Sequence, residues 1–245
     1  MKFINVLSCT VLFFNTISYS QSSLYPFQDR SFAINLRVDD LINRLTLEEK
    51  AGMLQHSSPA VERLGIVAYS WWNEALHGIG RAGSATVFPQ SIALAATFDE
   101  DAMLETFTLI SDEARAKYNE AQRNKEFGDY HGLTFWTPNI NLFRDPRWGR
   151  GMETFGEDPF LTMRMGMAAV KGLQGNNPYY LKADACAKHF AAHSGPESSR
   201  HQFNAIVSSR DLWQSYLPAF EFLIKNAKVG EVMCAYNRLN GEPCC

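Results

Sequence analysis

Five polar side chains that can bind hydroxyl groups follow apolar, strand-like runs of this 245-residue sequence. They are Glu74, Arg150, Lys188, His189 and Tyr236. The carboxylate of Glu74 can accept hydrogen bonds from two neighbouring hydroxyls at once. The side chains of Arg150 and Lys188 are fixed donors, and His189 can donate from one ring nitrogen. Together these residue types can accept and donate hydrogen bonds, which makes them candidates for a ligand site.

The elements that must position these residues alternate between short strands and longer helices. We expect strands at 66–71, 133–138, 182–190 and 231–235, and helices at 37–55, 99–118, 159–173 and 209–226. Such alternation predicts parallel βα units, in a barrel or in a doubly wound sheet. Polar residues that follow the strands share one mouth in a barrel, which favours the barrel.

Other ligand motifs are missing or incomplete. No G-x-G-x-x-G turn of a dinucleotide sheet occurs, and no G-x-S-x-G hydrolase elbow. His189 and His193 have the spacing of a zinc-binding helix, but the glutamate of H-E-x-x-H is absent and the stretch reads as a strand end. We therefore expect neither a metal nor a cofactor.

The composition is that of an ordinary globular chain. It is 46% hydrophobic, 20% charged and 13% aromatic, with a formal net charge of −3. A chain without a basic face is not expected to bind nucleic acid. Flat aromatic rings suit stacking on sugars, although core packing accounts for most aromatic residues in any protein.

Residues 1–20 have the pattern of a signal peptide. Lys2 supplies the positive charge, residues 4–17 are mostly apolar, and the small residues Ser18 and Ser20 precede Gln21. A buried N-terminal strand is the alternative. We expect a mature chain of residues 21–245 that is exported to the periplasm or the extracellular space. No other stretch is long enough to span a bilayer, so no membrane association is expected after cleavage.

Export permits disulfides among the four cysteines that remain after cleavage. Cys186 lies in a strand-like apolar run, where we expect a free, buried thiol. Cys234 is either free in the same way or bridged to Cys244 or Cys245. The spacing fits no zinc site.

Five motifs in order resemble glycoside hydrolase family 3. They are S-W-W-N-E-A-L-H-G at 70–78, F-R-D-P-R-W-G-R at 143–150, E-T-F-G-E-D-P at 153–159, A-K-H-F at 187–190 and M-C-A-Y-N at 233–237. The resemblance covers nearly the whole mature chain. Glu74 stands where many β-glucosidases of the family have Asp, which resembles the β-xylosidase and α-arabinofuranosidase branch.

The resemblance implies the N-terminal portion of a (β/α)8 TIM-like barrel from an exo-acting, retaining β-glycosidase. In the family, the residues that match Glu74, Arg150, Lys188 and His189 hold the terminal sugar, and the one that matches Tyr236 packs near the nucleophile. The expected partners are oligosaccharides or aryl glycosides. A retaining glycosidase needs two carboxyl groups about 5–5.5 Å apart. The resemblance places both beyond residue 245, so we expect this stretch alone to be inactive.

The sugar stays open between xylose, glucose and arabinose, and a non-catalytic sugar-binding remnant is a further alternative. The β-N-acetylglucosaminidase branch is disfavoured, because the loop at 191–196 lacks its Pro-Gly start.

Other residues of these motifs have structural explanations. Glu153, Glu157 and Asp158 precede Pro159, so they are expected to favour the start of a helix. Asp145 and Arg147 are expected to form a local pair, and Trp72 is kept out of the site. His77 and His193 are expected to be structural.

Overall fold

The computed structural model describes residues 25–193 and 195–244. The targeting segment predicted at 1–20 lies outside the described residues. The chain divides into two compact units, 1–50 and 51–245. No helix in the described ranges is both long enough and apolar enough to cross a membrane.

The first unit contains the turn η1 (Pro26–Gln28) and helix α1 (Ile34–Arg44), and it is held together by Asp40. The Asp40 carboxylate accepts a hydrogen bond from the Phe27 amide at 3.1 Å and two from the Arg44 guanidinium at 2.8 and 2.9 Å.

The single helix predicted at 37–55 is divided into α1 and α2 (Leu47–Gly52). Leu45 has extended backbone angles, and the next residue, Thr46, starts a new helix. Thr46 and Glu49 form a capping box, in which the Thr46 amide donates to Glu49 Oε2 at 2.8 Å and the Glu49 amide donates to Thr46 Oγ1 at 3.2 Å.

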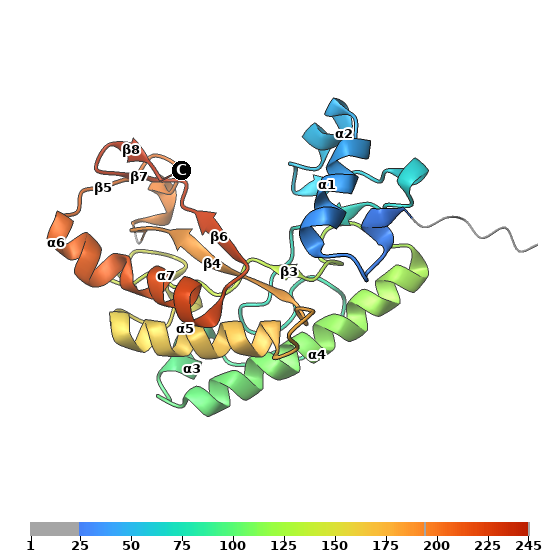
Figure 1. Ribbon diagram of the computed structural model, residues 1–245. Helices are drawn as coiled ribbons and strands as arrows, with labels where there is room; N and C mark the ends of the chain where they lie inside the picture. The colour runs from blue at the N-terminus through green and yellow to red at the C-terminus, as the bar shows by residue number, and fades with distance from the viewer. Residues whose placement is uncertain (1–24, 194, 245) are drawn as a thin grey trace, which may run out of the picture. The chain divides into compact units, whose positions relative to one another are not determined.

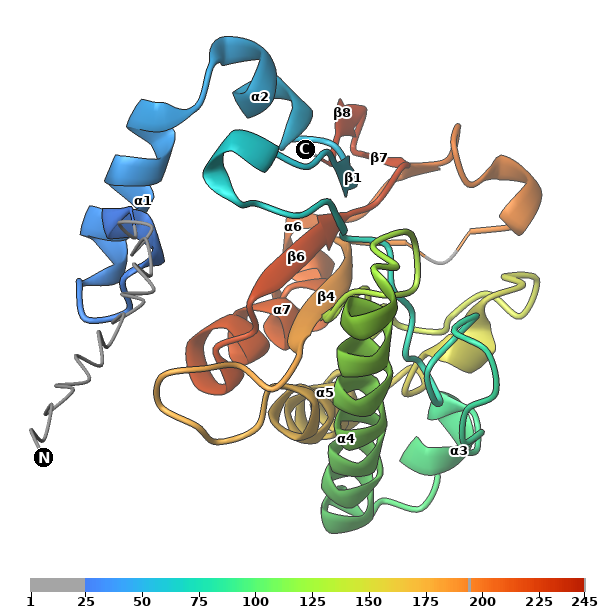
Figure 2. The ribbon, with the colours of Figure 1, turned by 90° about the vertical axis from the view of Figure 1, so that its right-hand side faces the viewer.

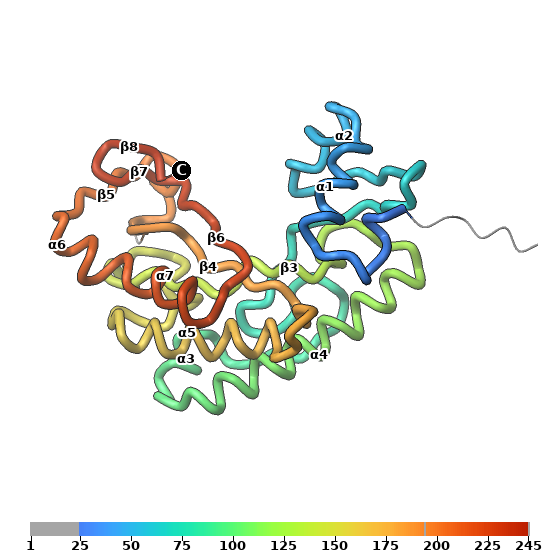
Figure 3. The backbone as a smooth tube through the Cα atoms, viewed as in Figure 1, coloured from blue at the N-terminus to red at the C-terminus, as the bar shows by residue number. Residues whose placement is uncertain are grey.

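The centre of the second unit is a three-stranded parallel sheet in the order β3-β4-β6 (Figure 1). Its strands are β3 (Thr134–Phe135), β4 (Asp184–Phe190) and β6 (Glu231–Cys234). Figure 3 follows the chain from β3 through α5 to β4, and then through a second helical segment to β6. Parallel strands joined by helices confirm the predicted βα units.

Helices α4 (Glu100–Asn124) and α5 (Pro159–Gln174) lie side by side in Figures 1 and 2. Gly172 permits this close packing, since a Cβ there would lie 2.7 Å from Phe107 Cβ. Both helices begin as the sequence predicts. Asp99 accepts from the Ala102 amide at 2.9 Å, and Asp158 caps α5, which has Pro159 at its first position.

The helical segment predicted at 209–226 is present but contains π-helical turns. It comprises α6 (Ser209–Asp211), η5 (Leu212–Tyr216), α7 (Pro218–Phe222) and η6 (Leu223–Ala227). Pro218 has no amide hydrogen to donate, so it makes no helical hydrogen bond through its nitrogen. The residue before it, Leu217, makes a π-type bond from its amide to the Leu212 carbonyl.

The remaining elements are short. They are β1 (Ser57–Ser58), η2 (Glu62–Leu64), β2 (Tyr69–Ser70), α3 (Ser91–Ala95), η3 (Gly151–Glu153), η4 (Glu197–Ser199), β5 (Asn204–Ala205), β7 (Arg238–Leu239) and β8 (Glu242–Pro243). The strand predicted at 66–71 is reduced to β2, which pairs antiparallel with β1 and lies outside the parallel sheet. Within the described residues the parallel sheet does not close into a barrel.

Candidate functional site

A cavity of about 720 Å³ collects all five residues that the sequence singles out: Glu74, Arg150, Lys188, His189 and Tyr236. Lys188 and His189 come from the last residues of β4, and Tyr236 follows β6. The cavity therefore lies at the carboxyl ends of the parallel strands, which is where ligand sites of such sheets are usually found. Residues far apart in the sequence meet here.

Lys188 is the most deeply buried charge of the cavity. Its side chain is 2% exposed, and its ammonium nitrogen donates to Glu74 Oε2 at 3.3 Å. Burial lowers the pKa of Lys188, while the negative charge of Glu74 opposes that shift. The side chain of Glu74 is 31% exposed, so its carboxylate is accessible from the cavity.

Asn73 holds Glu74 in place by tying the loop after β2 to β3. Its side-chain nitrogen donates to the Thr134 carbonyl at 2.9 Å, and its oxygen accepts from the Gly132 amide at 2.8 Å. The Trp136 amide donates to the Asn73 carbonyl at 2.9 Å. Asn73 is buried, and these bonds satisfy both ends of its amide.

Arg150 forms a two-point ion pair with Glu153. Arg150 Nε donates to Glu153 Oε1 at 2.8 Å, and Arg150 Nη2 donates to Glu153 Oε2 at 2.6 Å. Burial acts to raise the pKa of Glu153, but the hydrogen bonds and charge of Arg150 outweigh it and leave that pKa below its ordinary value. Glu153 is thus held ionised.

The sequence interpretation of Glu153 as part of a helix-entry cluster is wrong. Glu153 ends the turn η3, lines the cavity and faces Arg150. The three-residue spacing from Arg150 is the signal that could have revealed the pair. The interpretation of Asp158 is confirmed, because its Oδ1 accepts from the Leu161 amide at 2.7 Å.

Asn141 fixes the position and the proton of His189. The Asn141 side-chain nitrogen donates to the carbonyls of His189 and Ala191 at 2.8 and 2.9 Å. Its oxygen accepts from the His189 amide at 2.9 Å and lies 3.0 Å from His189 Nδ1. Since that oxygen can only accept, Nδ1 carries the hydrogen.

His189 Nε2 is therefore an acceptor, and it lies 3.3 Å from Arg150 Nη1, which donates to it. Burial, reinforced by the charges of Lys188 and Arg150, holds the pKa of His189 far below its ordinary value. The ring stays neutral at neutral pH. One ring nitrogen of His189 therefore donates, as the sequence suggests, but it donates to Asn141, and the other nitrogen accepts from Arg150.

An aromatic group lines another part of the cavity. The rings of Trp72 and Trp136 have centroids 5.0 Å apart, and the His56 ring meets Trp72 edge-on at 5.4 Å. Keeping Trp72 out of the site was wrong, because Trp72 lines the cavity and is 37% exposed. The sequence did not distinguish Trp72 from a packing residue.

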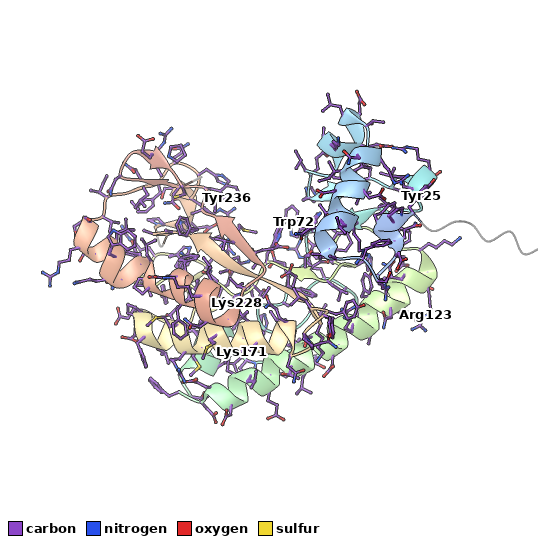
Figure 4. All side chains as sticks on the ribbon, viewed as in Figure 1. Tyr25, Trp72, Arg123, Lys171, Lys228 and Tyr236 are labelled. Carbon is purple, nitrogen blue, oxygen red and sulfur yellow. The ribbon has the colours of Figure 1, made fainter. Side chains whose placement is uncertain are left out.

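Tyr236 is the most exposed of the predicted site residues, at 68%. Its ring stacks on His201 with centroids 4.6 Å apart, and the Arg200 guanidinium lies 5.8 Å from the ring centre. Figure 4 labels Tyr236 and Trp72, both of which line the cavity.

The expectations of a local Asp145–Arg147 pair and of a structural His77 are confirmed. Arg147 donates twice to the Asp145 carboxylate, at 3.0 and 2.8 Å. His77 Nδ1 lies 3.0 Å from the Phe88 carbonyl and Nε2 lies 3.3 Å from the Gln90 side chain, so neighbouring groups satisfy both of its nitrogens. In residues 25–193 and 195–244, no group of three His, Cys, Asp or Glu side chains is arranged to hold a metal ion.

The cysteines differ from one another. Cys186 is free and buried, as expected. Cys234 is disulfide-bonded, so the expectation of a bridge is confirmed and that of a free thiol is wrong, and because Cys244 is free it is not the partner. Cys245 lies outside the described residues.

Four charges of the cavity form two ion pairs, Glu74 with Lys188 and Glu153 with Arg150, and His189 is neutral. Arg81 and Arg200 also line the cavity. Charged donors and acceptors beside aromatic rings suit a neutral ligand that has both hydroxyl groups and apolar C–H faces. The arrangement fits a sugar.

The known proteins that resemble this chain are glycosidases. The model of the glycosyl hydrolase family 3 N terminal domain matches residues 40–245. The chain is 51% identical over 224 residues to a xylan 1,4-beta-xylosidase of Xylanibacter ruminicola, covering 90% of this chain and 26% of that protein. It is 43% identical over 239 residues to a beta-xylosidase/alpha-L-arabinofuranosidase of Medicago sativa, covering 91% and 30%.

Among solved structures, the chain resembles a family 3 exo-beta-xylosidase in complex with a xylobiose aziridine activity-based probe. The two share 37% identity with a TM-score of 0.82, covering 91% of this chain and 30% of that one. The chain thus spans less than a third of the length of these relatives.

Proposed function

Because the chain belongs to glycosyl hydrolase family 3, we propose that it forms the sugar-binding part of an exo-acting, retaining β-glycosidase that prefers terminal β-xylosyl residues. The observation that carries the proposal is the cavity in which Glu74, Lys188, Arg150 and His189 meet. The parallel βα units support the further proposal that this sheet belongs to a TIM-like barrel in the whole protein.

We assign neither carboxylate of the cavity to the reaction itself. Glu74 is engaged by Lys188, and both oxygens of Glu153 accept from Arg150. A general acid must carry a proton at working pH, and Glu153 is held ionised. We assign Glu74 to the hydroxyls of the terminal sugar, with Lys188 and Arg150 as donors.

The ion pairs also explain why the site tolerates buried charge. Lys188 faces Glu74 and Arg150 faces Glu153, and a neutral sugar adds no charge to these two ion pairs when it binds. Aromatic rings such as Trp72 offer the apolar surface that the C–H face of a sugar requires.

Two measurements test the proposal. The chain should bind xylose in an NMR titration more tightly than it binds glucose or arabinose. The whole protein should release xylose from xylobiose and from 4-nitrophenyl β-D-xyloside, with retention of configuration. Faster release of glucose or arabinose would assign the protein to another branch of the family. Binding without turnover by the whole protein would identify a sugar-binding remnant.

We also propose that the protein is exported. The targeting pattern at 1–20 supports this, and so does the disulfide at Cys234, because disulfides persist mainly in oxidising compartments. Mass spectrometry of the protein recovered outside the cytoplasm should find an N-terminus near Gln21. An intact Met1 would contradict export through a cleaved signal.

A further inference from the structure

The guanidinium of Arg150 has five N–H groups, and its neighbours take three of them. Glu153 accepts from Nε and from one hydrogen of Nη2, and His189 Nε2 accepts from one hydrogen of Nη1. Within the described residues, one N–H on each terminal nitrogen is left without a protein partner. Because Arg150 lines the cavity, these two N–H groups form a pair of donors for a ligand.

We infer that Glu153 is a positioning residue that acts through Arg150, and that Asn141 supports it by making His189 an acceptor. This inference rests on the proposed sugar-binding function. A free arginine side chain populates many rotamers, and ordering it on binding costs affinity. The two-point ion pair with Glu153 fixes the guanidinium of Arg150 before the ligand arrives, and the hydrogen bond from Nη1 to His189 restrains it further.

The surroundings of Glu153 support a positioning role. Its side chain is 17% exposed, and Oε2 accepts from both Arg150 Nη2 and the Asn139 side-chain nitrogen, the latter at 3.3 Å. Both oxygens are thus occupied by protein donors. Glu153 therefore influences a ligand by what it does to Arg150.

The neutral state of His189 is the second requirement. A proton on Nε2 would place an N–H and a positive charge against Arg150 Nη1, 3.3 Å away. Asn141 selects the neutral form with its hydrogen on Nδ1, because its oxygen faces that nitrogen, and burial with the charges of Lys188 and Arg150 keeps a second proton off Nε2. The hydrogen bond to Arg150 therefore depends on an asparagine that is 48 positions from His189 in the sequence.

Substitution of Glu153 tests this inference directly. Glu153→Gln replaces one acceptor with an NH2 group that faces the guanidinium, so the two-point contact is lost. We expect the dissociation constant for xylose to rise by about 10- to 100-fold, since charge-assisted contacts are the stronger ones. Xylose is neutral, so the lost charge by itself changes the affinity little. Glu153→Asp keeps both acceptor oxygens and should recover part of the affinity.

A double-mutant cycle separates positioning from a general structural role. The full chain carries Glu153→Gln, Arg150→Ala or both, and xylose affinity is measured by NMR titration. If Glu153 acts through Arg150, adding Glu153→Gln to Arg150→Ala changes the affinity by less than 2-fold. Glu157→Gln is the matched control, because Glu157 is exposed and four positions away. It should bind xylose like the wild type.

An NMR measurement on the ligand-free chain completes the test. The Nε–H signal of Arg150 should be slow to exchange in the wild type and lost in Glu153→Gln. Additive losses in the cycle, or an unchanged Nε–H signal, would overturn the positioning role while leaving the sugar site intact. If the folded wild type binds none of the three sugars, the proposed function fails, and the Nε–H signal still reports on Arg150.

Discussion

Glu74 gives the sharpest test of the proposed site, because its carboxylate faces both the ligand cavity and the buried Lys188. Glu74→Ala removes the acceptor for the sugar hydroxyls and the counter-charge of Lys188 together. A hydrogen bond to a charged group contributes roughly 1.5–3 kcal/mol. Xylose affinity should therefore fall by about 10- to 150-fold, and kcat/KM of the whole protein by a similar factor.

The same substitution also affects folding. Removing one partner of a fully buried ion pair costs about 3–5 kcal/mol. Glu74 is 31% exposed, so solvent screening reduces the expected loss in the free energy of unfolding to about 1–2 kcal/mol. Glu74→Asp keeps the charge but withdraws it by one methylene. Its stability should stay near that of the wild type, while its preference between xyloside and glucoside shifts.

Denaturant unfolding and sugar titration on the same samples distinguish the two effects. Glu157→Ala serves as the control for removing an exposed carboxylate. The assignment of Glu74 would be refuted if folded Glu74→Ala kept the wild-type affinity for each sugar and the whole protein kept its kcat/KM on every aryl glycoside tested.

Acid should destabilise the chain through His189. Burial holds the pKa of His189 far below its ordinary value, so below about pH 6.5 only the unfolded state takes up the proton. The contribution of His189 to the free energy of unfolding then falls by about 1.4 kcal/mol per pH unit. In denaturant titrations at pH 7, 6 and 5, the free energy of unfolding should fall less in His189→Gln than in the wild type. An equal fall in the two proteins would contradict this prediction. Glu231 acts in the opposite direction, because burial and the charge of Asp184 raise its pKa to about 7. The folded state keeps a proton that the unfolded state has lost above about pH 4.5, so the free energy of unfolding falls as the pH rises toward 7. Relative to the wild type, Glu231→Gln should therefore have a free energy of unfolding that is about 1–2 kcal/mol more favourable at pH 8 than at pH 5 in the same titrations, after discounting for screening. A variant with equal effects at both pH values would refute the shift. Burial also raises the pKa of the Cys186 thiol to about 12, so iodoacetamide at pH 8 should leave Cys186 unmodified in the native chain and label Cys244, as read by peptide mass spectrometry. Rapid native labelling of Cys186 would contradict its burial.

The sequence by itself determined the features that depend on near neighbours in the chain. Asp99 and Asp158 start their helices because a capping side chain needs only the amides two or three residues ahead. The Thr46 and Glu49 capping box is local for the same reason. The motifs also identified Glu74, Arg150 and Lys188 as candidates, since their types and order carry the family resemblance.

Only the tertiary structure decided how these residues work together. Lys188 and Glu74 are 114 positions apart, and the packing of the loop after β2 against the sheet brings them together. The proton on His189 depends on Asn141, which lies in another segment and gives no local signal. Whether Trp72 packs in the core or lines the cavity depends on the space around it, and no pattern along the chain encodes that space. Local hydrogen bonds follow from the sequence, but the charges and protons of the site depend on distant groups that meet only in the folded chain.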